Sequence, residues 1–298
     1  MLFATTSLAA RVERAECAMA VAFGELAKMR RADALTAPVG GATAVYGGPG
    51  EPFNKLAGLG FAPLDEDVLA DVEREFDRRD APLQVEFAAL ADPDVATRLA
   101  RRGYHLVNFE HVLGLELTKA IVDRAAVECD THAANGVRVG RASKTDGASW
   151  LNAVATGFAH PDVFDGPPSH ESVARDALER VFDDFARIPG LVCYLAHRDG
   201  ALAGGASLRI IDGLAQLCGA ATLPDHRRRG VQSALLRARL VDAAREGCEL
   251  AIVTTQPASK SQENVQRAGF TLLYARAIMV RQPRAEATRA GTGQSPDP

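Results

Sequence analysis

The chain has 298 residues and a formal net charge of −4 at pH 7, and 47% of its residues are hydrophobic and 24% charged. This composition is typical of a folded globular protein. Such a small acidic excess gives no support for a surface that binds nucleic acid or an anionic membrane. At roughly 150 residues per domain, the length favours two domains.

The cysteine pattern and the N-terminal segment indicate the compartment. The five cysteines are Cys17, Cys129, Cys193, Cys218 and Cys248. Their number is odd and none forms a C-x-x-C pair, which disfavours a zinc site or a disulfide framework and favours a reducing compartment. We find no basic segment followed by an apolar run at the N-terminus, and no apolar stretch approaches the roughly 20 residues of a membrane span. We therefore expect a cytoplasmic protein that has no metal site, does not associate with a membrane and does not bind nucleic acid.

The first half of the chain alternates helices with short strands. Periodicity predicts helices over residues 8–31, 65–80 and 92–102, and strands over 42–46, 54–61, 83–87 and 106–117. In the second helix, Val68, Leu69, Val72 and Phe76 share one face. Asp92 is a plausible N-cap of the third.

The second half repeats this order more fully. Helices are expected over residues 148–157, 171–186, 230–246 and 259–267, and strands over 137–141, 191–197, 201–211, 214–223 and 250–255, with a final strand pair over 270–280. The Asp-Gly pairs at Asp199 and Asp212 predict hairpins. The tail 283–298 is rich in small and polar residues, which predicts disorder.

A domain boundary is expected between these halves, near residues 119–136, with domains at 1–120 and 133–282. Both halves end in the order helix, strand, helix, Gly-aromatic, strand. Arg102-Gly-Tyr104 corresponds in this way to Ala268-Gly-Phe270. We interpret this as a tandem duplication, although two unrelated α/β domains can share such an order.

The turn before residues 230–246 is suited to bind phosphate. The segment 223–236 reads Leu-Pro-Asp-His-Arg-Arg-Arg-Gly-Val-Gln-Ser-Ala-Leu-Leu, so a helix begins at Gly230 beside three arginines. The first amides of a helix have no intrahelical partner and lie at the positive end of its dipole, and guanidinium groups suit phosphate oxygens. A solvated run of charge is the alternative interpretation. Neither a Walker loop nor a G-x-G-x-x-G fingerprint occurs.

This segment resembles the central motif R/Q-x-x-G-x-G/A of the GNAT N-acetyltransferase superfamily. Downstream, Ser259-Lys-Ser-Gln-Glu-Asn264 and Gly269-Phe270 resemble that family's short helix before its penultimate strand. The resemblance covers residues 137–281. One position departs from the motif, because Gln232 stands where Gly or Ala is usual.

The resemblance implies an α/β fold with a mixed sheet, that is, a GNAT-like acyl-CoA N-acyltransferase fold in two tandem copies, and acetyl-CoA as co-substrate. The resemblance implies that backbone amides bind the pyrophosphate, and that the pantetheine arm pairs with the end of a strand. The residues implied for the pyrophosphate are Arg228, Arg229, Gly230, Val231, Gln232 and Ser233. Those implied for the pantetheine arm are Ala220, Ala221 and Thr222. Asn264 is assigned to the pantetheine or the adenine, or else to the helix surface.

The residues that move protons are less evident. In many members of the family, a Tyr four residues before the Gly-aromatic pair is the acid, and here that position is Val265. The strand 214–222 also lacks the carboxylate that often serves as base. Tyr274 is the candidate catalytic residue, and the weaker alternatives are Tyr194, Asp225 and His226. Cys218 is interpreted as a core residue, and Trp150, Phe158 and Phe164 as packing residues or as the lining of an acceptor site.

The first half carries acids where a phosphate loop would fall, at residues 62–67. It is therefore interpreted as a degenerate GNAT-like domain that completes the acceptor cleft or braces the other half. The function expected is transfer of an acetyl group from acetyl-CoA to a primary amine, with a small-molecule amine or a peptide as acceptor and the protein a monomer or homodimer. A non-catalytic acyl-CoA-binding or regulatory protein is the alternative, followed by an α/β domain with neither property.

Overall fold

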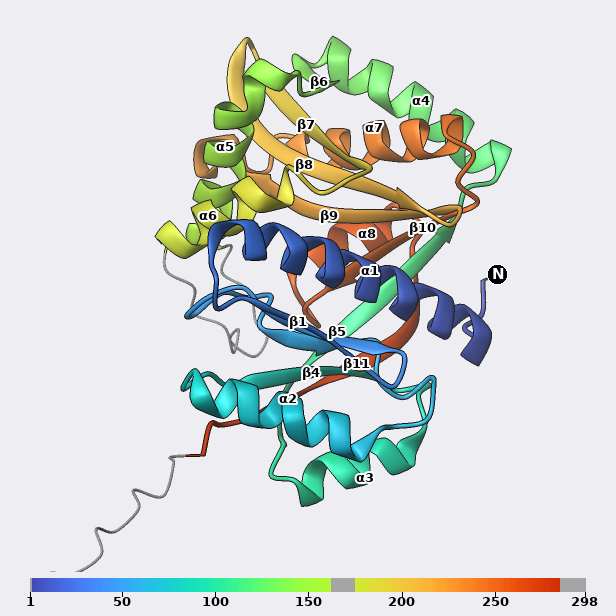
Figure 1. Cartoon of the computed structure of the whole chain (residues 1–298). Helices are drawn as coiled ribbons and strands as arrows, with labels where there is room; N and C mark the ends of the chain where they lie inside the picture. Colours follow the sequence, from blue (N-terminus) through green and yellow to red (C-terminus); the bar gives the residue numbers. More distant parts are fainter. Residues whose placement is uncertain (1, 162–174, 285–298) are drawn as a thin grey trace, which may run out of the picture.

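The structure, a computed structural model, describes residues 2–161 and 175–284 (Figure 1). The elements of the first half are α1 (Thr6–Arg30), β1 (Leu35–Val39), β2 (Ala42–Tyr46), β3 (Lys55–Ala57), α2 (Glu66–Arg78), β4 (Leu83–Ala88), α3 (Pro93–Arg101) and β5 (His105–Glu116). All the predicted elements are present, and β1 is additional. Helix α2 begins where predicted because the Asp65 carboxylate accepts a hydrogen bond from the Val68 amide at 3.1 Å.

The second half has the larger set of elements. They are α4 (Lys119–Ala134), β6 (Val137–Arg141), the 3₁₀ turn η1 (Lys144–Asp146), α5 (Gly147–Ala159), α6 (Arg175–Phe185), β7 (Leu191–Arg198), β8 (Ala201–Ile211), β9 (Leu214–Thr222), the 3₁₀ turn η2 (Pro224–His226), α7 (Val231–Arg245), β10 (Leu250–Thr255), α8 (Lys260–Arg267) and β11 (Thr271–Arg281). The region expected as a domain boundary is the helix α4. The final strand pair is instead one long strand, β11. Phe164, the start of the helix predicted at 171 and most of the tail lie outside the described residues.

All the described strands form one mixed sheet, in the order β1-β2-β3-β4-β11-β5-β10-β9-β8-β7-β6. The pairs β3–β4 and β9–β10 are parallel, and the other pairs are antiparallel. The last strand of each half pairs with strands of the other half. The strand β11 pairs with β4 and β5, and β5 pairs with β10 and β11. The two halves are therefore successive in sequence but interleaved at the centre of the sheet.

The two Gly-aromatic segments have the same local geometry. The Tyr104 amide donates to the Leu99 carbonyl and the Phe270 amide to the Val265 carbonyl, each at 3.1 Å. The glycines before them have φ of +94° and +104°, and both aromatic rings are buried. The strand order is symmetric about the central pair β11 and β5, because each of these strands is flanked on its outer side by one strand of the opposite half. This symmetry and the shared geometry of the two Gly-aromatic turns are what duplication of a domain produces.

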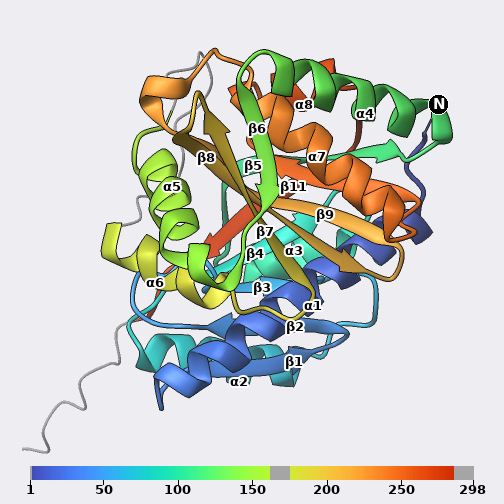
Figure 2. The ribbon, with the colours of Figure 1, turned by 90° about the horizontal axis from the view of Figure 1, so that it is seen from above.

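Helices cover both faces of the sheet. On β8, a Cβ on Gly205 would contact Trp150 of α5, whereas one on the adjacent Gly204 would contact Val231 of α7. Consecutive residues of a strand face opposite ways, so α5 and α7 cover opposite faces (Figure 2). Helix α1 crosses both halves, since it packs on β2 and accepts a hydrogen bond at the Ala15 carbonyl from Arg209 of β8 at 3.1 Å (Figure 1). Within the described residues, no helix combines the length and apolar character needed to span a membrane.

Candidate functional site

The sheet opens between two neighbouring parallel strands, β9 and β10. They pair from Leu214 and Leu250 as far as Leu217 and Val253. Beyond that point β9 stays paired with β8 as far as Thr222. A register shift in the β8–β9 ladder and the positive φ of Gly219, +53°, mark a bulge in β9 at this point. Because a bulge bends its strand, β9 leaves β10 and exposes backbone groups that a strand-like ligand can pair with.

A cavity of about 790 Å³ occupies this opening on the side of α7 and α8. It is lined by all the predicted cofactor-binding residues except Arg229: Ala220, Ala221, Thr222, Arg228, Gly230, Val231, Gln232, Ser233 and Asn264. We call it the first cavity. Its volume lies in the upper part of the range of about 300–1,000 Å³ found for ligand pockets, so it can hold an elongated ligand.

The loop that enters α7 has the conformation expected of an anion-binding turn. Arg228 and Gly230 have φ of +58° and +80°, and Gly230 caps the helix without a side-chain hydrogen bond. The first helical bond runs from the Ala234 amide to the Gly230 carbonyl at 2.9 Å. The preceding amides of the turn therefore have no carbonyl partner within the helix. Arg227 steadies the loop by donating to the carbonyls of Thr222 and His160.

The predicted catalytic tyrosine lies elsewhere. The Tyr274 hydroxyl is buried and donates to Glu13 Oε1 at 2.7 Å, and Tyr274 is not among the described residues that line the first cavity. The prediction placed it by its distance from Gly269-Phe270, but its side chain faces α1. Tyr194 is also buried, and its hydroxyl donates to Asp242 at 2.9 Å.

The remaining sequence candidates separate into lining and packing residues. His226 and Phe158 line the first cavity, and Asp225 is exposed on η2. Trp150 is fully buried and its indole N–H donates to the Ala206 carbonyl at 2.9 Å. It is therefore a packing residue. Burial raises the pKa of the Cys218 thiol to about 11, which keeps it protonated near neutral pH.

One of the residues that line the first cavity is a buried arginine. Arg239 of α7 lines the cavity and donates to the carbonyls of Leu235 and Ser207 at 3.0 and 3.1 Å. Burial lowers its pKa to about 10, so it remains charged near pH 7. It supplies positive charge next to the bulge in β9.

A second cavity, of about 310 Å³, meets the first at the opening between β9 and β10. Leu217, Cys218, Gly219, Val253 and Thr254 line both cavities. The other walls of the second cavity come from α1, α6 and strands of both halves. The two cavities therefore adjoin at the opening in the sheet, one on the α7 side and one on the α1 side.

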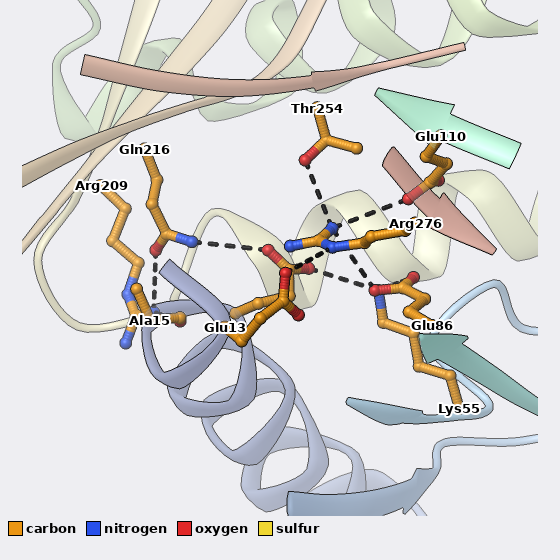
Figure 3. Close-up of polar contacts among 10 residues, drawn as sticks. Glu13, Ala15, Lys55, Glu86, Glu110, Arg209, Gln216, Thr254 and Arg276 are labelled. Atoms are coloured by element: carbon orange, nitrogen blue, oxygen red, sulfur yellow. Dashed lines mark hydrogen bonds and ion pairs between the residues drawn. The ribbon is translucent and has the colours of Figure 1, made fainter. Parts of the chain in front are cut away.

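Charged side chains from four strands and α1 converge on the second cavity (Figure 3). Lys55 Nζ lies 2.7 Å from Glu86 Oε1 and 3.3 Å from Glu16 Oε1. Arg276 Nη1 lies 3.6 Å from Glu86 Oε2 and 3.7 Å from Glu110 Oε2. Burial, reinforced by the charge of Glu86 and opposed by Arg276 and Lys55, raises the pKa of Glu110 to about 8.

Sequence analysis does not find this cluster, because its members come from both halves. A signal is present in β5, where Glu110 stands between Phe109 and His111 in a strand that also contains the apolar run 112–115. Its meaning depends on β5 lying beside β10 and β11, which local patterns do not reveal.

In a comparison with protein families, residues 162–270 match the model of the acetyltransferase (GNAT) family. This part of the chain is a GNAT domain. Comparison with curated proteins gives no match.

Solved structures with a similar fold cover most of the chain. A GCN5-related N-acetyltransferase from Kribbella flavida aligns over 91% of this chain and 97% of its own, with a TM-score of 0.58 and 18% identity. A tandem GNAT protein from the clavulanic acid biosynthesis pathway aligns over 83% and 79%, with a TM-score of 0.55 and 16% identity. A GCN5-related N-acetyltransferase from Sphaerobacter thermophilus aligns over 73% and 67%, with a TM-score of 0.51 and 15% identity. At these identities the likeness concerns the fold, and it confirms the predicted tandem GNAT architecture.

Proposed function

We propose that this protein transfers an acetyl group from acetyl-CoA to a primary amine. The observation that carries the proposal is the opening between β9 and β10, where the first and the second cavity share five lining residues. A reaction between two substrates needs binding sites that adjoin in this way, because the reacting atoms must meet while the rest of each substrate stays bound on its own side.

The first cavity suits coenzyme A along its whole length. In the proposed pose, the amides from Arg228 to Ser233 bind the pyrophosphate at the start of α7. The pantetheine arm pairs with the free edge of β9 near Ala221, as an added strand does. The thioester then lies beside Gly219, where both cavities are lined by the same residues.

The chemistry requires a neutral amine and stabilisation of negative charge. With an amine pKa near 10.4, neutralisation at pH 7 costs about 4–5 kcal/mol, so a base in the second cavity would increase the rate. In our proposal, Arg239 supplies positive charge close to the carbonyl oxygen and the departing sulfur. Holding amine and thioester in contact contributes further, on the order of several kcal/mol.

The absence of a tyrosine acid favours a second candidate, a non-catalytic acyl-CoA-binding protein. Val265 occupies the position of the usual tyrosine, and the described residues that line the first cavity include no tyrosine. A thiol of ordinary acidity can leave without a dedicated acid, since its pKa is near 8.5. We therefore favour the enzyme.

Two measurements on the purified chain test the proposal. Calorimetry with acetyl-CoA should give saturable binding at one site, and thiol release with a panel of primary amines should exceed the rate with acetyl-CoA alone. Binding without release for any amine would support the binding protein. No binding would refute both functions.

A further inference from the structure

The second cavity lies where the two halves of the chain meet. Val12, Glu16 and Met19 of α1 line it, together with Gln216 of β9, whose Nε2 donates to Glu16 Oε2 at 3.5 Å. The first half supplies α1, β3, β4 and β5 to this cavity, whereas the second half supplies α6, β9, β10 and β11. Neither half alone encloses it. The first half is therefore part of the site and not only a brace for the GNAT domain.

The polar end of the cavity has three carboxylates against two cations. Glu16 and Glu86 both contact Lys55, and Arg276 is held chiefly by a fourth carboxylate outside the cavity lining, Glu13, at 2.8 Å. The nearest cation to Glu110 is Arg276 at 3.7 Å, which exceeds hydrogen-bonding distance. Glu110 is thus the least neutralised carboxylate of the cluster. Its side chain is 29% exposed although it lies on a central strand, since it faces the cavity.

The other end of the cavity is apolar. Phe53 and Phe185 line it with ring centroids 6.3 Å apart, and Met19 and Val12 complete this wall. The two ends adjoin, because Lys55 Nζ lies 5.0 Å from the Phe53 ring centroid. At about 310 Å³, the cavity is at the lower limit of the range for ligand pockets, roughly 300–1,000 Å³. A small cation with an apolar arm fits this combination of size, charge and lining.

We propose that the second cavity is the acceptor site, that it takes a small primary amine with one positive charge and an apolar arm, and that Glu110 accepts the ammonium proton. This inference rests on the proposed acetyl transfer. It gives the first half of the chain a direct part in catalysis, through a carboxylate that stands across the sheet opening from the bound cofactor.

The proposed transfer proceeds through a neutral amine. The ammonium group gives one proton to the Glu110 carboxylate, and the neutral nitrogen attacks the thioester carbonyl carbon. The C–N bond forms and the C–S bond breaks, and the second nitrogen proton goes to the departing sulfur. Amide and free coenzyme A thiol leave, and Glu110 returns its proton to water.

The surroundings of Glu110 determine how the rate depends on pH. The charged groups that face it are Glu16 from α1, Lys55 from β3, Glu86 from β4 and Arg276 from β11. Burial is the largest influence and raises the pKa of Glu110 to about 8. Because the ionised carboxylate is the base, kcat/KM should rise with pH and level off above about 8.

The test compares Glu110→Gln with Glu116→Gln in the full chain. Glu116 lies on the same strand but is exposed. The substrates are acetyl-CoA with 2-phenylethylamine, spermidine or a lysine-containing peptide, and thiol release is followed from pH 6 to 10. We expect kcat/KM for 2-phenylethylamine to exceed the other two at least tenfold. Glu110→Gln should lower kcat by 100-fold or more and abolish the pH dependence near 8, with the dissociation constant for acetyl-CoA within twofold. Glu116→Gln should behave as the wild type.

The experiment distinguishes failure of the Glu110 assignment, of the acceptor class and of the proposed acetyl transfer. If the wild type binds acetyl-CoA and turns over but Glu110→Gln keeps the rate and the pH profile, the assignment of Glu110 is wrong while acetyl transfer stands. A preference for spermidine or the peptide would overturn the acceptor class. If no amine is acetylated by the wild type, the proposed function fails, and this inference fails with it.

Discussion

Replacing one arginine of the phosphate loop should weaken coenzyme A binding, whereas replacing its neighbour should not. Arg228 lines the first cavity and Arg229 does not, although both are exposed and adjacent. Arg228→Gln and Arg229→Gln remove the same charge. Glutamine at position 228 meets the same positive φ of +58° as the arginine, so the comparison isolates the guanidinium group.

The expected magnitude follows from the contact that is lost. A hydrogen bond to a charged group contributes about 1.5–3 kcal/mol, and the exposure of Arg228 favours the lower value because solvent screens the interaction. A loss of about 1.5 kcal/mol raises the dissociation constant roughly tenfold. Because the Debye length falls to about 3 Å at 1 M salt, the difference between the two variants should shrink at high salt.

Calorimetric titration with coenzyme A, at low and at high salt, measures this difference directly. A localised contact by Arg228 is refuted if Arg229→Gln weakens binding as much as Arg228→Gln. Equal losses would mean that the loop attracts the cofactor through its total charge, without a localised site at the start of α7.

Four further substitutions examine other parts of the structure. Glu13→Ala leaves a buried cation without its closest partner and should lower the free energy of unfolding by about 3 kcal/mol or more, measured by urea titration; a loss below 1 kcal/mol would contradict the buried ion pair. Tyr274→Phe should reduce stability by about 1–3 kcal/mol and keep thiol release within threefold of wild type, so a large loss of kcat would restore Tyr274 as a catalytic candidate. Gly230→Ala and Gly247→Ala both place a side chain at φ of +80°, but only the former approaches His132, at 3.2 Å. Both should therefore lose stability in thermal unfolding, and only Gly230→Ala should also weaken coenzyme A binding.

The phosphate loop is predictable because its determinants are local. A strand end, a helix start and Gly230 lie within about a dozen residues, and backbone conformation at such a turn depends mainly on these residues. The same holds for the Gly-aromatic turns before β5 and β11. Helix α4, by contrast, is missed: it packs against α7 and β6, and the stability of a helix comes mostly from such tertiary packing.

The second cavity is not predictable in this way. Its carboxylates lie on α1, β4 and β5, and they come together only because β11 inserts between β4 and β5. The position of the Tyr274 side chain is also set by tertiary structure and not by local sequence. Its distance from Gly269-Phe270 suggests a role at the thiol, but the direction of its side chain depends on which helix covers that face of β11.

The crossed final strands have a consequence for synthesis of the chain. Among the described residues, β5 pairs only with β10 and β11, both of which are translated more than 130 residues later. At a translation rate on the order of 10 residues per second, the synthesis of β10 and β11 follows that of β5 by roughly 15 seconds. By then α1 and the strands that precede β5 have already left the ribosome. The first half therefore cannot complete its own folding until β10 and β11 have been translated, and a ribosome that stops before β11 releases a chain whose central strands have unpaired edges and a tendency to aggregate.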